Sequence, residues 1–239
     1  SPYPEDYSLP LNELIEAQGA VTFIASPNSP SGTLIPIELL DKLAAQLSGI
    51  LVVDEAYADF AESNALELVN KYGNVIILRT LSKGYSLAGL RLGFGVANPA
   101  LLEGLIKVKD SYNVDAVACA VGAAAIADQP YKNANAQKII AARTLLANSL
   151  EQLGFYVFPS QANFLLAQVS QTVADKLAKS SNQEPTLSPG EYLYETLKQQ
   201  GILVRYFKQP RLEDKLRITV GTPEQNDALI QSLNAALTN

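Results

Sequence analysis

The chain has 239 residues, a formal net charge of -6 and a hydrophobic fraction of 48%, values that fit a globular protein and argue against a disordered chain or a coiled coil. The acidic balance disfavours nucleic acid and anionic membranes as general partners. The chain has no histidine and one cysteine, so it lacks the commonest metal ligand and the usual base of a catalytic triad. We therefore expect no metal site, zinc catalysis or serine-hydrolase chemistry.

The first seven residues are rich in proline, tyrosine and acidic side chains, unlike a secretion signal, and no apolar run is long enough to span a bilayer. These features predict a cytoplasmic protein. The chain contains no methionine, so we expect a processed or internal start.

In the first half of the chain, apolar runs that predict strands alternate with segments of helical spacing. Strands are expected at 20–25, 50–53, 75–78 and 93–97, and helices at 11–17, 36–47 and about 63–71. This alternation, with uniformly apolar strands, predicts parallel βαβ units covered on both faces. The predicted fold class is therefore α/β, with a central, mostly parallel sheet between helices.

Polar clusters follow three of these strands, at 28–32, 54–57 and 82–91. Ligands of parallel sheets bind at the carboxyl ends of the strands, so the three clusters predict one shared site. Lys83 lies just beyond a buried strand and is a candidate for a desolvated, reactive amine, while Arg91 could bind an anionic group such as phosphate. Taken alone, the loop could equally be a surface loop with solvated cations.

The pattern of predicted helices and strands differs in the second half of the chain. Helices are expected at 98–107, 116–127, 131–153, 191–200 and from 223, and strands at 156–158, 163–168, 202–206 and 215–220. This mixture predicts a small C-terminal α+β domain at 130–239, after the part of a larger domain at 1–129. A polar insertion at 179–190 is expected to be a mobile loop.

Several motifs, in this order and at these spacings, resemble the signature of fold-type-I aminotransferases that use pyridoxal 5'-phosphate (PLP), and most closely that of the histidinol-phosphate aminotransferase family. The motifs are Ser26-Pro27-Asn28-Ser29-Pro30-Ser31-Gly32, Asp54-Glu55-Ala56-Tyr57, Ser82-Lys83-Gly84, Arg91-Leu92-Gly93 and Lys215-Leu216-Arg217-Ile218-Thr219-Val220-Gly221. The segments 112–114, 162–165 and 201–205 add to the likeness, which covers nearly the whole chain.

The resemblance implies a role for each residue of the first motifs. Lys83 would hold PLP as a Schiff base and then transfer the proton of the reaction. Asp54 would face the pyridine nitrogen and Tyr57 the ring oxygen, while Ser82 and Arg91 would bind the cofactor phosphate. Read without the family, Asp54 could be a turn residue and Tyr57 a core residue.

The resemblance also implies that Arg217 binds the substrate carboxylate of the glutamate half-reaction and that Arg217 or Arg205 binds the phosphate of histidinol phosphate. Arg205 could equally be a solvated charge at a strand end. The family usually has a second asparagine where this chain has Ser29. Whether Asn28 or Ser29 contacts the PLP oxygen is therefore left open. Tyr112 and Asn113 could break a helix or reach across a dimer interface.

The family pattern begins about one third earlier, so the chain resembles a truncated enzyme that lacks part of the phosphate site and the aromatic residue that stacks on PLP. The resemblance implies a homodimer that transaminates L-histidinol phosphate with 2-oxoglutarate. The alternatives are an aromatic amino acid aminotransferase, a threonine-phosphate decarboxylase and an inactive fragment. For the chain as given, we expect weak cofactor binding and a tendency to aggregate.

Overall fold

A computed structural model describes residues 2–180 and 187–238. The chain forms two units, Ser1–Ser29 with Thr33–Gln137 and Pro30–Gly32 with Lys138–Asn239. The units divide inside helix α6 (Gln129–Leu153), and the domain boundary expected after residue 129 stays a prediction. Residues 181–186 of the expected mobile loop lie outside the described residues.

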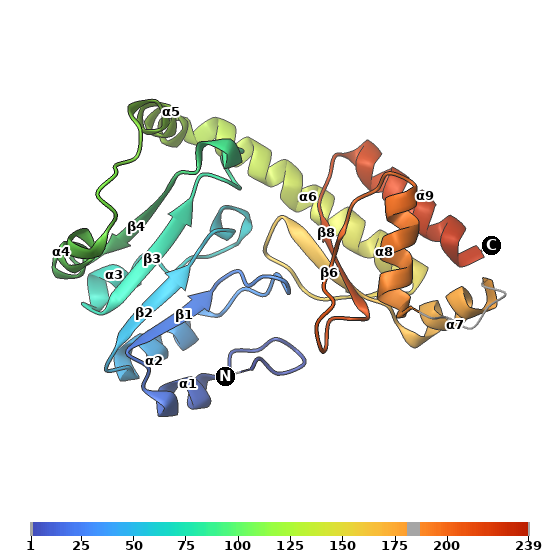
Figure 1. Cartoon of the computed structure of the whole chain (residues 1–239), viewed down its shortest axis with the longest axis horizontal. Coiled ribbons are helices and arrows are strands. Elements are labelled where there is room, and N and C mark those ends of the chain that lie inside the picture. Colours follow the sequence, from blue (N-terminus) through green and yellow to red (C-terminus); the bar gives the residue numbers. More distant parts are fainter. Residues whose placement is uncertain (1, 181–186, 239) are drawn as a thin grey trace. The chain divides into compact units, whose positions relative to one another are not determined.

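The first unit contains a four-stranded sheet in the order β1-β2-β3-β4 (Figure 1). Its strands are β1 (Val21–Ala25), β2 (Ile50–Asp54), β3 (Val75–Thr80) and β4 (Gly93–Ala97). The first three are parallel, and β4 runs antiparallel to β3. This confirms the predicted mostly parallel sheet. Because parallel strands end at the same edge, the segments after β1, β2 and β3 emerge together.

One face of this sheet is covered by α1 (Leu11–Ala17), α2 (Ile37–Gln46) and α3 (Leu68–Lys71). Helix α2 carries apolar residues at positions three and four apart, which places Leu40, Leu43 and Ala44 on the buried side. They pack in one cluster with residues of all three parallel strands, such as Val53, and each buried leucine contributes about 1.5–3 kcal/mol. On β1, alternation turns Phe23 the other way, and this residue is 70% exposed.

Helix α3 is shorter than the predicted segment at 63–71 because a local turn competes with it. The side chain of Asn64 accepts a hydrogen bond from the backbone N–H of Leu66 at 3.1 Å. Such a bond between residues i and i+2 satisfies the backbone outside a helix, so the helix starts only at Leu68.

Two short 3-10 helices lie within the connections of the first sheet, η1 (Ala58–Phe60) between β2 and β3 and η2 (Ala88–Leu90) between β3 and β4. After β4, the chain continues through α4 (Pro99–Val108), α5 (Ala116–Ala127) and α6. The side chains of Asn98 and Asp115 cap α4 and α5, each accepting a hydrogen bond from a backbone N–H of the first turn. Tyr112 and Asn113 lie between these two helices.

The second unit has an antiparallel sheet in the order β5-β6-β8-β7 with helices α7 (Gln171–Ser180), α8 (Pro189–Gln199) and α9 (Pro223–Thr238). The strands are β5 (Tyr156–Val157), β6 (Phe164–Gln168), β7 (Arg205–Tyr206) and β8 (Lys215–Thr219). Leu150, Leu165, Leu216 and Leu233 belong to its core.

Strand β7 is shorter than the predicted 202–206 because the chain still caps α8 at that point. Gly201 has a φ of +79°, and the N–H of Ile202 donates to the carbonyl of Leu197 at 2.9 Å. A glycine in the left-handed region followed by such a bond is a common helix C-terminus. Within the described residues, no helix combines the length and apolar composition needed to cross a membrane.

Candidate functional site

The carboxyl edge of the parallel strands brings the first two motifs together. Asp54 ends β2, opposite Ala25 of β1 and Leu78 of β3. Its backbone carbonyl accepts a hydrogen bond from the N–H of Ser26 at 2.9 Å, which ties the 26–32 segment to β2. The Asp54 side chain is exposed, and its Oδ1 atom accepts from the N–H of Ala56 at 3.0 Å. The carboxylate is thus oriented locally while open to a ligand.

Lys83 lies in the loop after β3. The hydroxyl of Thr80 donates to Ser82 Oγ at 3.0 Å and accepts from the Ser82 N–H at 3.1 Å, so the residue before Lys83 is fixed to the strand end. The Lys83 amine, Nζ, lies 5.7 Å from the centre of the Tyr57 ring, in the range of a cation–π contact. Within the described chain, Lys83 forms no ion pair.

The expectation that Lys83 is desolvated is not met in this structure, because the residue is exposed. The first residues of the strand before it are buried as predicted, but exposure rises after Leu81, which is buried, through Ser82, which is partly buried, to Lys83. The amine is therefore accessible from solvent, next to Tyr57.

Arg91 follows η2 in the left-handed region, with a φ of 53°. That conformation is uncommon for a residue other than glycine. Its Nη1 atom donates to the carbonyl of Ala88 at 2.9 Å, and the side chain is exposed. Ser82 and Arg91 therefore occupy the two ends of one loop, each with a local hydrogen-bond partner.

Asn28 and Ser29 differ in exposure. Asn28 is buried, and its side chain hydrogen-bonds Tyr3, which partly offsets the rise that burial causes in the pKa of Tyr3. Ser29 is exposed. Its neighbours Pro30–Gly32 belong to the second unit, where the carbonyl of Gly32 accepts from the N–H of Gln161 at 2.8 Å. The sequence motif at 26–32 is thus divided between the two units.

Glu55 forms a buried ion pair that was not predicted from the sequence. Its side chain is 1% exposed, and its Oε2 atom lies 2.7 Å from Nε and from Nη2 of Arg79 on β3. Its other oxygen accepts from the backbone N–H of Ala65. Burial raises the pKa of Glu55, and these hydrogen bonds and the Arg79 charge oppose that rise. The alternation of side chains along β2 was the available signal, since it turns Asp54 and Glu55 to opposite sides.

A second missed group lies beside Lys83. Asp59, on η1, pairs with Lys132 of α6 at 3.1 Å, and the two side chains are 10% and 13% exposed. No motif marked them, because 73 residues separate them in the chain.

The two candidate substrate arginines lie in the second unit. Arg205 of β7 and Arg217 of β8 are direct partners in the antiparallel register. The Arg205 guanidinium lies 5.2 Å from the centre of the Phe207 ring, and that of Arg217 lies 5.6 Å from the same ring and 5.0 Å from the ring of Phe164. Like charges directly opposite each other on a sheet repel. This pair therefore creates a positive, aromatic-lined patch suited to an anion.

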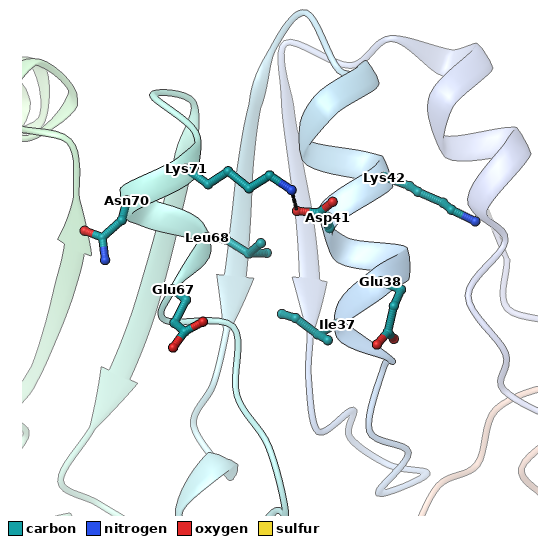
Figure 2. Close-up of a pocket in the computed structure, with 8 residues that line it drawn as sticks. All are labelled: Ile37, Glu38, Asp41, Lys42, Glu67, Leu68, Asn70 and Lys71. Atoms are coloured by element: carbon teal, nitrogen blue, oxygen red, sulfur yellow. Dashed lines mark hydrogen bonds and ion pairs between the residues drawn. The ribbon is translucent and has the colours of Figure 1, made fainter.

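A hollow of about 650 Å³ lies between α2 and α3, away from these motifs (Figure 2). The side chain of Lys71 reaches across it to Asp41 at 2.6 Å, and side-chain exposures of 58% and 33% show that this pair is solvated. The hollow brings none of the predicted site residues together.

Comparisons with known proteins agree with the motifs. The family described as aminotransferase class I and II matches residues 2–233. Histidinol-phosphate aminotransferase 1 of Trichormus variabilis is 60% identical over 236 residues, covering 99% of this chain and 63% of the relative. The protein of the same name from a Nostoc species is 61% identical, with 99% and 62% covered. The chain therefore spans less than two thirds of the length of these relatives.

Solved structures that resemble the fold of this chain include proteins of the same name. The crystal structure of histidinol-phosphate aminotransferase from Sinorhizobium meliloti, in complex with pyridoxal-5'-phosphate, superposes with a TM-score of 0.83 at 26% identity. The match covers 99% of this chain and 63% of that structure. The structure from Clostridium acetobutylicum, at 21% identity and a TM-score of 0.82, shows the same fold.

Proposed function

The chain belongs to the class I and II aminotransferase family, and from that premise we propose that it is part of a PLP-dependent aminotransferase acting on L-histidinol phosphate and 2-oxoglutarate in histidine biosynthesis. The observation that carries the proposal is the accessible Lys83 amine, 5.7 Å from the Tyr57 ring, at the sheet edge where Asp54 ends β2. The substrate assignment is supported by the names of relatives that share 60% and 61% of its residues.

The chemistry of the groups at this edge of the sheet fits PLP. A primary amine at Lys83 suits its aldehyde carbon, the Asp54 carboxylate suits a protonated pyridine nitrogen, and the Tyr57 hydroxyl suits the ring oxygen. Of the two candidates in the 26–32 segment, Ser29 is the exposed one. Ser82 and Arg91 supply a hydroxyl and a guanidinium for the phosphate, which is a good match for charge-assisted hydrogen bonds.

When bound, PLP supplies an electron sink for the negative charge that develops at the substrate Cα atom. The residues of this chain then have separate tasks. Lys83 would hold the aldehyde carbon through its primary amine, and its Nζ atom would be the group that accepts and returns the Cα proton. Asp54 would favour the protonated ring nitrogen, and Tyr57 would hydrogen-bond the neighbouring oxygen. Arg91 and Ser82 would hold the phosphate and so keep the ring in place relative to these groups.

Arg217 and Arg205 are proposed as the substrate anion site of the second unit. A guanidinium binds carboxylate and phosphate by paired hydrogen bonds, so one patch can accept the two substrates in turn. Histidinol phosphate has no carboxylate, and its phosphate is the group these arginines would recognise. An anion there would also relieve the repulsion between the two charges.

We further propose a cytoplasmic homodimer whose interface includes α5. This helix has the sequence of a fully buried helix, with no charged residue among its twelve positions. Only Ala118 and Gly122 are buried, whereas Val117 is 69% exposed. An apolar helix of this kind is stable in water only when another surface covers it. The exposed Tyr112, just before α5, would lie at the rim of that interface.

The test is reductive trapping. The chain is incubated with PLP, reduced with borohydride and mapped by mass spectrometry, with K83R as the control that keeps a cation but removes the primary amine. We expect the stable adduct on Lys83 in the wild type and its loss from that peptide in K83R. An adduct on another lysine as the main product would disprove the assignment of Lys83.

Substrate choice is tested separately by measuring glutamate formed from 2-oxoglutarate with histidinol phosphate, phenylalanine or threonine phosphate as the amino donor. We expect histidinol phosphate to give the highest rate. A higher rate with phenylalanine would indicate an aromatic aminotransferase. Release of carbon dioxide from threonine phosphate without a keto product would indicate a decarboxylase.

A further inference from the structure

The loop that carries Lys83 is packed against the turn that carries Tyr57 at a point where only glycine fits. A Cβ atom added to Gly84 would lie 2.3 Å from Oδ2, 2.5 Å from Cγ and 2.6 Å from Cβ of Asp59. Such distances do not occur between real non-bonded atoms. Glycine at position 84 therefore lets the Asp59 carboxylate lie directly against the backbone that follows Lys83.

Asp59 is held in that place by Lys132. The Nζ–Oδ1 distance is 3.1 Å, and the two side chains are 10% and 13% exposed, so solvent screens this ion pair much less than a surface pair. Lys132 comes from α6, and Asp59 from η1 just after Tyr57. The pair thus joins a helix to the loops of the candidate site within the first unit.

The same lysine also contacts the next residue of the loop. Lys132 Nζ lies 5.6 Å from the centre of the Tyr85 ring, and the Tyr85 hydroxyl accepts from Nε2 of Gln129 at 3.0 Å. Gly84 and Tyr85 are therefore both in contact with the Asp59–Lys132 pair or with α6. The turn itself is closed by the N–H of Ser86, which donates to the carbonyl of Lys83 at 3.0 Å.

The charges around the pair alternate in sign. The buried Glu55 carboxylate feels the negative charge of Asp59 and is itself paired with Arg79. Neutralising Lys132 would leave Asp59 facing Glu55 without its cation, and buried like charges repel strongly. A cation at position 132 is therefore needed to keep Asp59 beside Gly84.

We propose that Asp59 and Lys132 are positioning residues for Lys83, because their ion pair fixes Gly84 and Tyr85 against the turn that carries Tyr57. The inference rests on the proposed function in taking Lys83 as the reactive amine. Neither residue touches the reacting atoms; they act by restricting where the backbone places the Lys83 side chain. Lys132 would contribute through its charge, so arginine should replace it better than an uncharged residue.

The first experiment measures the loop without PLP. Backbone hydrogen exchange of the peptide 81–87 is followed by mass spectrometry in the wild type, D59N, K132M and K132R. The matched controls are D41N and K71M, which break the solvated Asp41–Lys71 pair of the same unit (Figure 2). We expect about tenfold faster exchange of 81–87 in D59N and K132M, with the β2 peptide unchanged, and near wild-type exchange in K132R and the controls.

The second experiment measures the rate of borohydride-trapped PLP adduct formation at Lys83 in the same variants. We expect the rate to fall about tenfold in D59N and K132M, since small errors in placing reacting groups are costly, and to be restored by K132R. Wild-type exchange and trapping in D59N and K132M would overturn the proposal. Equal acceleration of exchange in all peptides would also overturn it, since the pair would then only stabilise the unit.

The two readouts separate failure of the positioning role from failure of the proposed function. If the wild type forms no selective adduct at Lys83, the proposed function fails, and hydrogen exchange alone decides whether the ion pair orders the loop. If Lys83 is trapped but the variants behave as the wild type in both measurements, only the positioning role fails.

Discussion

The structure shows two reasons for a glycine, a positive φ and a neighbour that leaves no room for a Cβ atom. Alanine substitutions at four glycines separate these two reasons. Gly32 has a φ of +81°, and its Cβ would lie 2.2 Å from Ser160 Oγ. Gly201 has a φ of +79° with no atom within 4 Å of an added Cβ. Gly84 lacks a positive φ but meets Asp59, and Gly73 has neither constraint. Each comparison stays within one unit, because Gly32 and Gly201 lie in the second unit and Gly84 and Gly73 lie in the first.

The expected losses follow from these contacts. For G201A we expect about 1 kcal/mol, the cost of the left-handed conformation less the entropy gained by restricting the unfolded chain. In G32A the new methyl must also displace Ser160, whose hydroxyl donates to the carbonyl of Phe164 at 2.6 Å and accepts from the N–H of Ala162 at 3.1 Å. Two lost hydrogen bonds of about 1 kcal/mol each bring the total to about 3 kcal/mol.

In the first unit, we expect G73A to be neutral or to stabilise by about 0.5 kcal/mol, because it only restricts the unfolded chain. G84A should cost about 2 kcal/mol, since the Asp59–Lys132 pair must open. Urea titrations followed by far-ultraviolet circular dichroism give these differences, with chevron or peptide-level exchange data to assign each to its unit. Equal losses in G32A and G201A would refute the claim that contact with Ser160 requires a glycine at position 32.

Three further predictions concern charge and assembly. Burial raises the pKa of Glu55 above its ordinary 4.5, so just above that pH the folded chain retains a proton that the unfolded chain releases, and the stability that this group confers falls as the pH rises from about 4.5. The unfolding free energy of the wild type minus that of E55Q should therefore decrease with rising pH, and an increase would mean that attraction to Arg79 dominates. R91Q should weaken binding of PLP about tenfold but leave binding of pyridoxal, which has no phosphate, nearly unchanged in equilibrium titrations; an equal loss for the two would remove Arg91 from the phosphate site. V117K should shift sedimentation toward the monomer, whereas L145K, at an equally exposed leucine of α6, should not, and a dimer that persists in V117K would place the interface elsewhere.

Much of the fold follows from patterns that are local in the sequence. Apolar strands alternating with amphipathic helices predict a parallel sheet, and the ends of α4 and α5 are marked by Asn98 and Asp115, whose side chains cap the helices. The errors in helix and strand length also have local causes, at Asn64 and Gly201, where hydrogen bonds compete with the expected element. Those bonds depend on side-chain and backbone geometry, which hydrophobic periodicity does not describe.

The candidate site, like the fold, was predictable from the sequence only in part. The sequence alone predicted that Asp54 and Lys83 follow neighbouring strands and lie at one edge of the sheet, because the carboxyl ends of parallel strands lie at the same edge. It could not show that Lys83 points into solvent or that Asp54 is open while Glu55 is buried against Arg79. Those outcomes depend on which way the chain turns after each strand.

Only the tertiary structure could identify the contacts between distant residues. Asp59 and Lys132 lie 73 positions apart, and no motif links them, yet they meet beside Gly84 in the first unit. Gly32 is part of the 26–32 motif, whose first residues lie in the first unit, but it belongs to the second unit and packs there against Ser160. The sequence by itself determined which chemical groups the chain carries and which sheet edge receives them, because those depend on residue type and strand direction. Long-range packing decided which of these groups are exposed, paired or held in place.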